Sequence, residues 1–98
     1  MAGRVEFTPE ASEDVAEAFS WYERQQPGLG REFETHLDSA IAMIRAMPAA
    51  GSPVHRGLRR CLLARFPFAV YYAAEDDVLV MRAVLHHRRD PRTWRRRA

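Results

Sequence analysis

The side chains best suited to chemistry lie near the end of the sequence, where the run HHRR occupies positions 86–89. Imidazole can donate or accept a proton near neutral pH, and guanidinium binds phosphate or carboxylate through two parallel hydrogen bonds. Three more arginines occupy positions 95–97. This clustering predicts a site for an anionic partner or for acid–base chemistry. The alternative is a solvated turn in which Asp90 pairs with neighbouring arginines.

Charge is distributed unevenly along the 98 residues, although the net charge is only +2. Residues 1–38 contain three arginines and nine acidic residues, whereas residues 39–98 contain twelve arginines and four acidic residues. All fifteen basic residues are arginine, which suits planar, two-pronged recognition of anions. The asymmetry predicts a partner for the basic half. A general preference for arginine over lysine explains the composition equally well.

Other features argue against a cofactor or a membrane. His36, His55 and the single Cys61 show no metal-ligand spacing. The segment PGLG at 27–30 lacks the preceding strand and the lysine of a nucleotide site, so it predicts a turn between helices. One cysteine cannot form an internal disulfide and suits a reducing compartment. No apolar run approaches the roughly 18 residues of a membrane span, so we expect a cytoplasmic domain without metal or cofactor.

Three apolar segments would position the basic run, at 58–65, 68–74 and 78–86. They are rich in Leu, Val and aromatic residues, as half-buried strands are. Phe66-Pro67 and the acidic turn at 75–77 separate them, and connections this short require antiparallel neighbours. The sequence therefore predicts a three-stranded meander whose last strand ends at the basic run.

Alternation along a strand sends neighbouring side chains to opposite faces. Tyr71 and Tyr72 are therefore expected on different faces of the sheet. His86 and His87 would divide in the same way if the last strand included both. Trp94 is expected to dock a short terminal helix, residues 91–97, on the sheet, and stacking against a partner is the alternative.

A short strand and two helices precede the meander. The segment at 4–7 is expected to form an edge strand. A helix is expected to start at Thr8-Pro9-Glu10, because Thr can cap free amides, Pro suits the first helical turn and Glu meets the positive end of the helix dipole. Apolar residues at helical spacing predict a first helix ending near residue 26 and a second over 29–47, folded back on the first. The apolar stripe of the second helix comprises Phe33, Leu37, Ala40, Ile41, Ile44 and Met47. Residues 48–57 are expected to form a polar loop.

Together these elements predict one α+β domain over residues 1–98, in the order β-α-α-β-β-β. An antiparallel sheet would carry the helical hairpin on one face, and a short helix would follow the last strand. Because both long helices lie on one face, the other face and the strand edges would remain available to a partner.

Five segments resemble the RelE/ParE superfamily of small bacterial toxins from type II toxin–antitoxin systems, and within it the ParE branch of plasmid-stabilisation proteins. The segments are VEFTPEA at 5–11, WYE at 21–23, PGLGREF at 27–33, RRCLLARFPFAVYY at 59–72 and AVLHHRRDPRTWRRR at 83–97. They cover nearly the whole chain. The resemblance implies a cognate antitoxin protein as partner, with operator DNA contacted only through the antitoxin.

The activity that the resemblance implies depends on the branch. Ribonuclease members cut mRNA on the ribosome, which needs a base, cations for the phosphorane and an acid. Their catalytic positions, transferred without gaps, fall on Arg60, Leu62, Ala69, Arg88 and Trp94, so that one lysine, one arginine and a tyrosine hydroxyl are missing. ParE-like members instead stabilise the cleaved-DNA state of DNA gyrase without chemistry of their own, and this incomplete set resembles theirs.

The expected residues for binding a target or antitoxin are Arg60, His87, Arg88, Arg89, Arg92 and Trp94. If the chain is instead an mRNA endonuclease, the catalytic candidates are Arg60, His86, His87 and Arg88, with the histidines as the acid–base pair. A third alternative is a non-catalytic nucleic-acid-binding domain. The expected partners are the antitoxin together with gyrase or, for the nuclease, with ribosome and mRNA.

Overall fold

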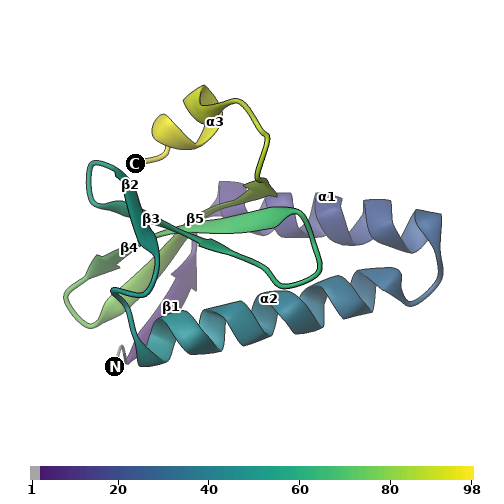
Figure 1. Ribbon diagram of the computed structural model, residues 1–98, viewed down its shortest axis with the longest axis horizontal. Coiled ribbons are helices and arrows are strands. Elements are labelled where there is room, and N and C mark those ends of the chain that lie inside the picture. The colour runs from purple at the N-terminus through teal and green to yellow at the C-terminus, as the bar shows by residue number, and fades with distance from the viewer. Residues whose placement is uncertain (1–2) are drawn as a thin grey trace.

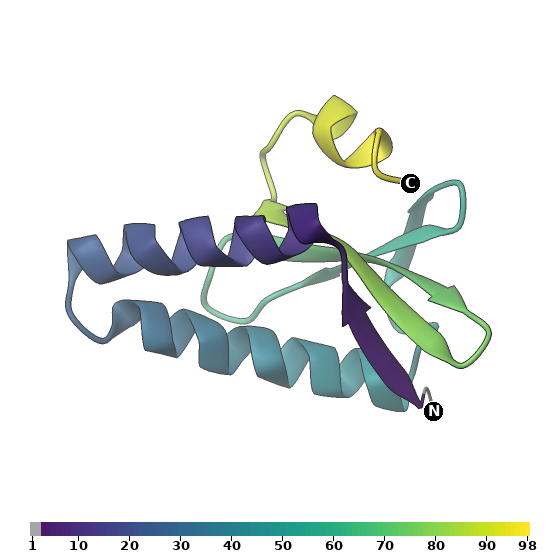
Figure 2. The ribbon, with the colours of Figure 1, turned by 180° about the vertical axis from the view of Figure 1, so that it is seen from behind.

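The computed structural model describes residues 3–98, which form a five-stranded sheet with helices on both faces (Figure 1). The strand order is β1-β5-β4-β3-β2. The long helices α1 and α2 cover one face, and α3 lies against the other (Figure 2). The predicted α+β class, helical hairpin and terminal helix are confirmed. In chain order the elements are β1 (Arg4–Phe7), α1 (Pro9–Gln25), α2 (Leu29–Ala46), β2 (Ser52–His55), β3 (Leu58–Leu62), β4 (Phe68–Glu75), β5 (Val78–His86) and α3 (Pro91–Arg95).

The helix α1 begins where the sequence predicts, because Thr8 caps it. The Thr8 hydroxyl accepts a hydrogen bond from the Ala11 amide at 3.1 Å, and Pro9 occupies the first helical turn. The Thr8 amide donates to the carbonyl of Met81 in β5 at 3.0 Å. The cap therefore also fixes the position at which α1 leaves the sheet.

The turn between α1 and α2 is held by Glu23, whose carboxylate accepts hydrogen bonds from the amides of Gly28 at 3.0 Å and Gly30 at 2.8 Å. Gly28 is left-handed, with φ of 91°. Gly30 lies so close to α1 that an added Cβ would come within 2.7 Å of the Phe19 carbonyl oxygen. The segment PGLG joins two closely packed helices, as predicted.

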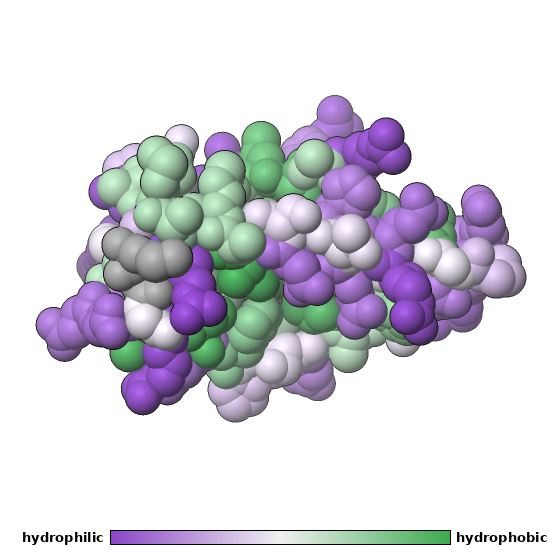
Figure 3. Space-filling view, turned by 90° about the horizontal axis from the view of Figure 1, so that it is seen from below, coloured by the Kyte–Doolittle hydropathy of each residue, from purple (hydrophilic) through white to green (hydrophobic). Residues whose placement is uncertain are grey.

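The main core lies between the helical hairpin and the sheet. Phe33 and Ile44 of α2 are fully buried there, together with Tyr72 of β4. Ile41 is only partly buried, and Met47, which the apolar stripe places in the core, is 63% exposed because α2 ends at Ala46. Apolar surface gathers on this side of the molecule toward the end of α2 (Figure 3).

One strand is not predicted from the sequence. Residues 48–57, expected to be a polar loop, contain β2, which pairs antiparallel with β3 at the edge of the sheet. This strand is short, contains Pro53 and has a register shift, so it lacks an alternating apolar pattern. The Tyr72 hydroxyl anchors the segment, accepting from the Gly51 amide at 2.9 Å and donating to the Pro48 carbonyl at 2.8 Å. The strand β3 also ends earlier than expected, at Leu62.

The sheet is mixed, because β1 pairs in parallel with β5. Val5 lies opposite Leu79 and Phe7 opposite Met81. The meander of β3, β4 and β5 is antiparallel as predicted. The argument from short connections applies only to that meander; β1 is followed by two helices, and so its direction is not fixed by a tight turn.

The centre of the opposite face is covered by α3, so the expectation that this whole face is open is wrong. Trp94 is 6% exposed and lies on Tyr71, with ring centroids 4.9 Å apart and planes at 17°. The buried cluster on this face comprises Leu58, Ala69, Tyr71, Ala83, Leu85 and Trp94. Tyr71 and Tyr72 divide between the faces, as alternation predicts.

Candidate partner-binding site

The loop after β5 carries the first part of the site. His87 donates its amide to the Pro67 carbonyl and Arg89 donates to the His86 carbonyl, both at 2.9 Å. The Arg88 amide donates to Nδ1 of His86 at 3.1 Å. These bonds fix the backbone of the loop, whereas the side chains of His87, Arg88 and Arg89 are exposed. The structure therefore presents guanidinium groups on an ordered turn.

The two histidines of this loop lie together. Their ring centroids are 4.9 Å apart with planes at 30°. The strand β5 ends at His86, so the separation onto opposite faces, which requires the strand to continue through His87, does not occur. His86 also contacts the ring of Phe68 at 5.8 Å. Because Nδ1 of His86 accepts from Arg88, the proton of the neutral imidazole is on Nε2.

Asp90 starts α3 and pairs with Arg92, as the solvated-turn alternative expects. The Asp90 carboxylate accepts from the Arg92 amide at 2.9 Å and from Nη2 of Arg92 at 2.6 Å. Hydrogen bonding from the Arg92 side chain, followed by that from its amide, lowers the pKa of Asp90. The same pair raises the pKa of Arg92. The Arg92 side chain is therefore engaged in part by the carboxylate that caps α3.

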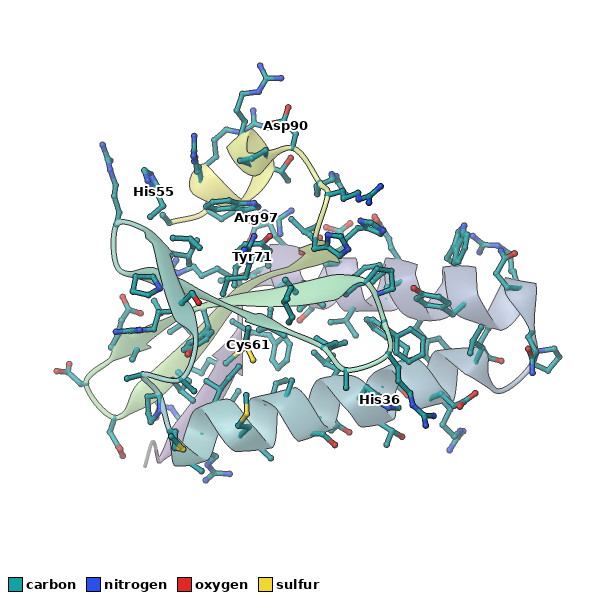
Figure 4. All side chains as sticks on the ribbon, viewed as in Figure 1. His36, His55, Cys61, Tyr71, Asp90 and Arg97 are labelled. Atoms are coloured by element: carbon teal, nitrogen blue, oxygen red, sulfur yellow. The ribbon has the colours of Figure 1, made fainter. Side chains whose placement is uncertain are left out.

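Trp94 lies on the side of α3 that faces the sheet, where it is buried against Tyr71. It is therefore not exposed for stacking on a partner. The guanidinium of Arg95 lies over its ring, 5.5 Å from the centroid. Figure 4 shows Tyr71 lying between the sheet and α3. Trp94 thus positions the arginines of α3, which agrees with the expected docking role.

Arg97 and Asp14 form a contact that the sequence does not predict. Both terminal nitrogens of Arg97 donate to the carboxylate of Asp14, although the two residues are 83 positions apart. Asp14 also accepts from the Val84 amide at 3.0 Å. Its side chain is 9% exposed and that of Arg97 is 21% exposed, so the pair is largely shielded from solvent. One carboxylate thereby joins α1, β5 and the end of the chain.

Arg60 lies apart from the histidines. It is opposite Tyr71 in the sheet and so shares the α3 face, whereas His86 is opposite Phe68 and shares the face of the long helices. Leu62 is 59% exposed and Ala69 is buried, and neither offers a charge. The four residues proposed for a nuclease are therefore not brought to one point.

What the structure does assemble is a basic surface on the loop and α3. We call it the C-terminal basic cluster; its exposed members are Arg88, Arg89, Arg92, Arg95 and Arg96. Over residues 3–98, no group of three His, Cys, Asp or Glu side chains is placed to hold a metal ion. Nor is any helix within that range long and apolar enough to cross a bilayer. The arrangement is suited to binding anionic groups of a partner.

The fold is that of a family of toxins from type II toxin–antitoxin systems. The family model described as ParE toxin of type II toxin-antitoxin system, parDE, matches residues 5–91, and the chain belongs to that family. Toxin ParE2 from two strains of Mycobacterium tuberculosis is 27% identical over 92 residues, which cover 93% of this chain and 88% of that protein.

A solved structure supports the fold. A chain of the chromosomal ParDE TA system from P. aeruginosa superposes with a TM-score of 0.75 at 17% sequence identity. The match covers 85% of this chain and 94% of that chain. The predicted resemblance to the ParE branch of the RelE/ParE superfamily is confirmed.

Proposed function

We propose that this ParE-family toxin inhibits DNA gyrase by binding it, without catalysing a reaction, and that a cognate antitoxin neutralises it by occupying the C-terminal basic cluster. The observation that carries the proposal is the separation of Arg60 from His86 on opposite faces of the sheet. A cleavage centre needs its base, acid and cations within hydrogen-bonding reach of one phosphate. A binding surface has no such requirement.

The antitoxin is the partner that the family implies, and the charges of the cluster indicate its chemistry. Four of the five arginines, all but Arg92, form no ion pair with another residue in the described range 3–98. Carboxylates of an antitoxin segment can therefore pair with Arg88 and Arg89 without displacing an internal partner. A segment that is disordered when free would need an interface above roughly 1,000 Å² on each partner to offset its ordering cost.

One observation favours the nuclease as the second candidate. His86 and His87 lie with their rings 4.9 Å apart, which is close enough for both to reach one substrate group. The pair would have to work without Arg60, and with Arg88 and Arg89 as the nearest cations in sequence. The gyrase proposal therefore predicts no mRNA cleavage, and the nuclease alternative predicts cleavage that is abolished by His87→Ala.

The test is induction of the chain in the cytoplasm of a bacterial host without antitoxin. Gyrase inhibition predicts a DNA damage response and covalent gyrase–DNA complexes, with translation continuing at first. Codon-specific cuts in mRNA on translating ribosomes would instead establish the nuclease. Arg88→Glu with Arg89→Glu should reduce toxicity and antitoxin affinity together. Arg31→Glu with Arg65→Glu is a matched control, because both arginines are exposed and lie outside the cluster.

A further inference from the structure

An open groove of about 580 Å³ runs between α1 and the end of β5. Its α1 wall includes Glu13, Glu17 and Trp21, and its opposite side includes His86 and Arg89. The groove therefore begins at the loop that carries the C-terminal basic cluster and continues along the acidic helix. A partner segment that contacts Arg89 has a direct path into it.

Trp21 is a preformed apolar anchor in this groove. Its side chain is 52% exposed, which is unusual for so large an aromatic residue. The ring is oriented by an edge contact with Tyr22, whose centroid is 5.1 Å away. Phe68 lies across the groove. An exposed aromatic side chain held by its neighbours beside a groove is typical of the residues that dominate binding energy at interfaces.

Two carboxylates on the α1 wall are available to a cation, at the opposite end of the wall from Arg24. Glu13 and Glu17 lie one helical turn apart and are exposed, and neither forms an ion pair with another residue in the range 3–98. Between them in sequence, Asp14 already binds the guanidinium of Arg97. This wall thus accommodates one arginine from the chain itself, and two carboxylates beside it remain open.

We propose that a cationic segment of the antitoxin docks in this groove. An aliphatic or aromatic side chain of the segment packs between Trp21 and Phe68, and its lysine or arginine side chains pair with Glu13 and Glu17. The lining of α1 extends from Glu13 to Arg24, a length of about 16 Å, which matches three turns of an amphipathic helix. The proposal rests on neutralisation by an antitoxin and adds a basic, apolar-anchored segment to the acidic contacts at the arginines.

The test uses the full chain and its purified cognate antitoxin. Glu13→Lys with Glu17→Lys should weaken antitoxin binding at least tenfold in calorimetry. Glu34→Lys with Asp38→Lys is the matched control, since these exposed residues of α2 have the same spacing and undergo the same change of charge. Trp21→Ala should also weaken binding and does not alter charge. Circular dichroism would establish that each variant is folded.

Fluorescence gives an independent measurement. The chain has two tryptophans, so Trp94→Phe leaves Trp21 as the only one, and its emission should shift to the blue when the antitoxin covers it. Unchanged affinity of the Glu13/Glu17 variant together with unchanged emission would overturn the groove proposal alone, provided that the wild-type chain is toxic and binds the antitoxin. A wild-type chain that does neither would overturn the proposed function itself. Loss of toxicity with full antitoxin affinity would assign the groove to the target and would also overturn the proposal.

Discussion

On one face of the sheet, α1 and α2 bury thirteen residues in one cluster, whereas on the other face α3 completes a cluster of six. The first cluster is closed by helices of 17 and 18 residues. The second is closed by five helical residues, the Trp94–Tyr71 stack and the Arg97–Asp14 pair. The first face holds the larger buried cluster, and the second is covered by the helix that carries part of the C-terminal basic cluster.

Under the proposed function, the face beneath α1 and α2 provides the main core, and the α3 face positions arginines of the C-terminal basic cluster. Substitutions under the long helices should change global unfolding, because those residues form the main core. Substitutions around α3 should change the placement of the C-terminal basic cluster and should lower the free energy of unfolding by less. The predictions that follow test this division, beginning with the largest expected effect.

Ile44→Ala should lower the free energy of unfolding by about 2–5 kcal/mol, because it removes a fully buried side chain and leaves a cavity. Ile41→Ala should cost less, since Ile41 is only partly buried. Met47→Ala, at a site that is 63% exposed, is the control and should have little effect. Urea denaturation measures all three. Equal losses of unfolding free energy for the Ile44 and Met47 variants would show that the side of α2 assigned to the core is wrong.

Asp14→Asn should lower stability by about 1–2 kcal/mol, because it leaves Arg97 without its anionic partner in a largely shielded position. The loss should appear mainly as faster hydrogen exchange and proteolysis of α3. The amides of α2 should keep their protection. Glu17→Gln, at an exposed position near the middle of the same helix, is the control. Uniform loss of protection throughout the chain would mean that the two faces unfold as one unit.

The sequence predicts the elements whose pattern is local. The helical stripes apart from Met47, the capping residues around Thr8 and the alternation of Tyr71 and Tyr72 are confirmed. Each of these features depends on neighbours within a few positions. The strand β2 is not predicted, because Pro53 and a register shift leave it without an alternating apolar pattern, and the segment before it is held by a hydroxyl supplied by Tyr72.

The candidate site is predicted only in part, for the same physical reason. The basic run after β5 is visible as composition, and the structure places it on an exposed turn. The Asp14–Arg97 pair joins residues 83 positions apart, which no local spacing can indicate. The groove beside Trp21 likewise depends on the packing of α1 against the end of β5. The proximity of the two histidines depends on where β5 ends, a boundary that sequence patterns place poorly.

The adjacent tyrosines of β4 lie on opposite faces of the sheet, so the two faces can be compared within one strand. The Tyr72 hydroxyl makes two hydrogen bonds, to Gly51 and Pro48, whereas the buried Tyr71 hydroxyl has no partner within residues 3–98. Tyr72→Phe should therefore cost about 1–2 kcal/mol, and Tyr71→Phe should be neutral or slightly stabilising. Thermal unfolding of both variants measures the contrast. Equal destabilisation by the two substitutions would contradict the assigned hydrogen bonds.

The smallest effect expected is a pH dependence confined to the start of α3. Because Arg92 lowers the pKa of Asp90, the folded carboxylate holds its charge at lower pH than the unfolded one. The stabilisation it gives is present above the unfolded pKa, near 4, and is lost as the pH falls through the folded value. NMR titration should find that Asp90 ionises at lower pH in the wild-type chain than in the Arg92→Gln variant, which lacks the guanidinium donor. Since Asp90 starts the helix that carries Arg92 and Arg95, the Arg92 amide should shift over the same acidic range while the amides of α2 stay unchanged. If Asp90 titrates at the same pH in the wild-type chain and in the Arg92→Gln variant, the Asp90–Arg92 pair is not held in solution, and Arg92 joins the other arginines as a free member of the cluster.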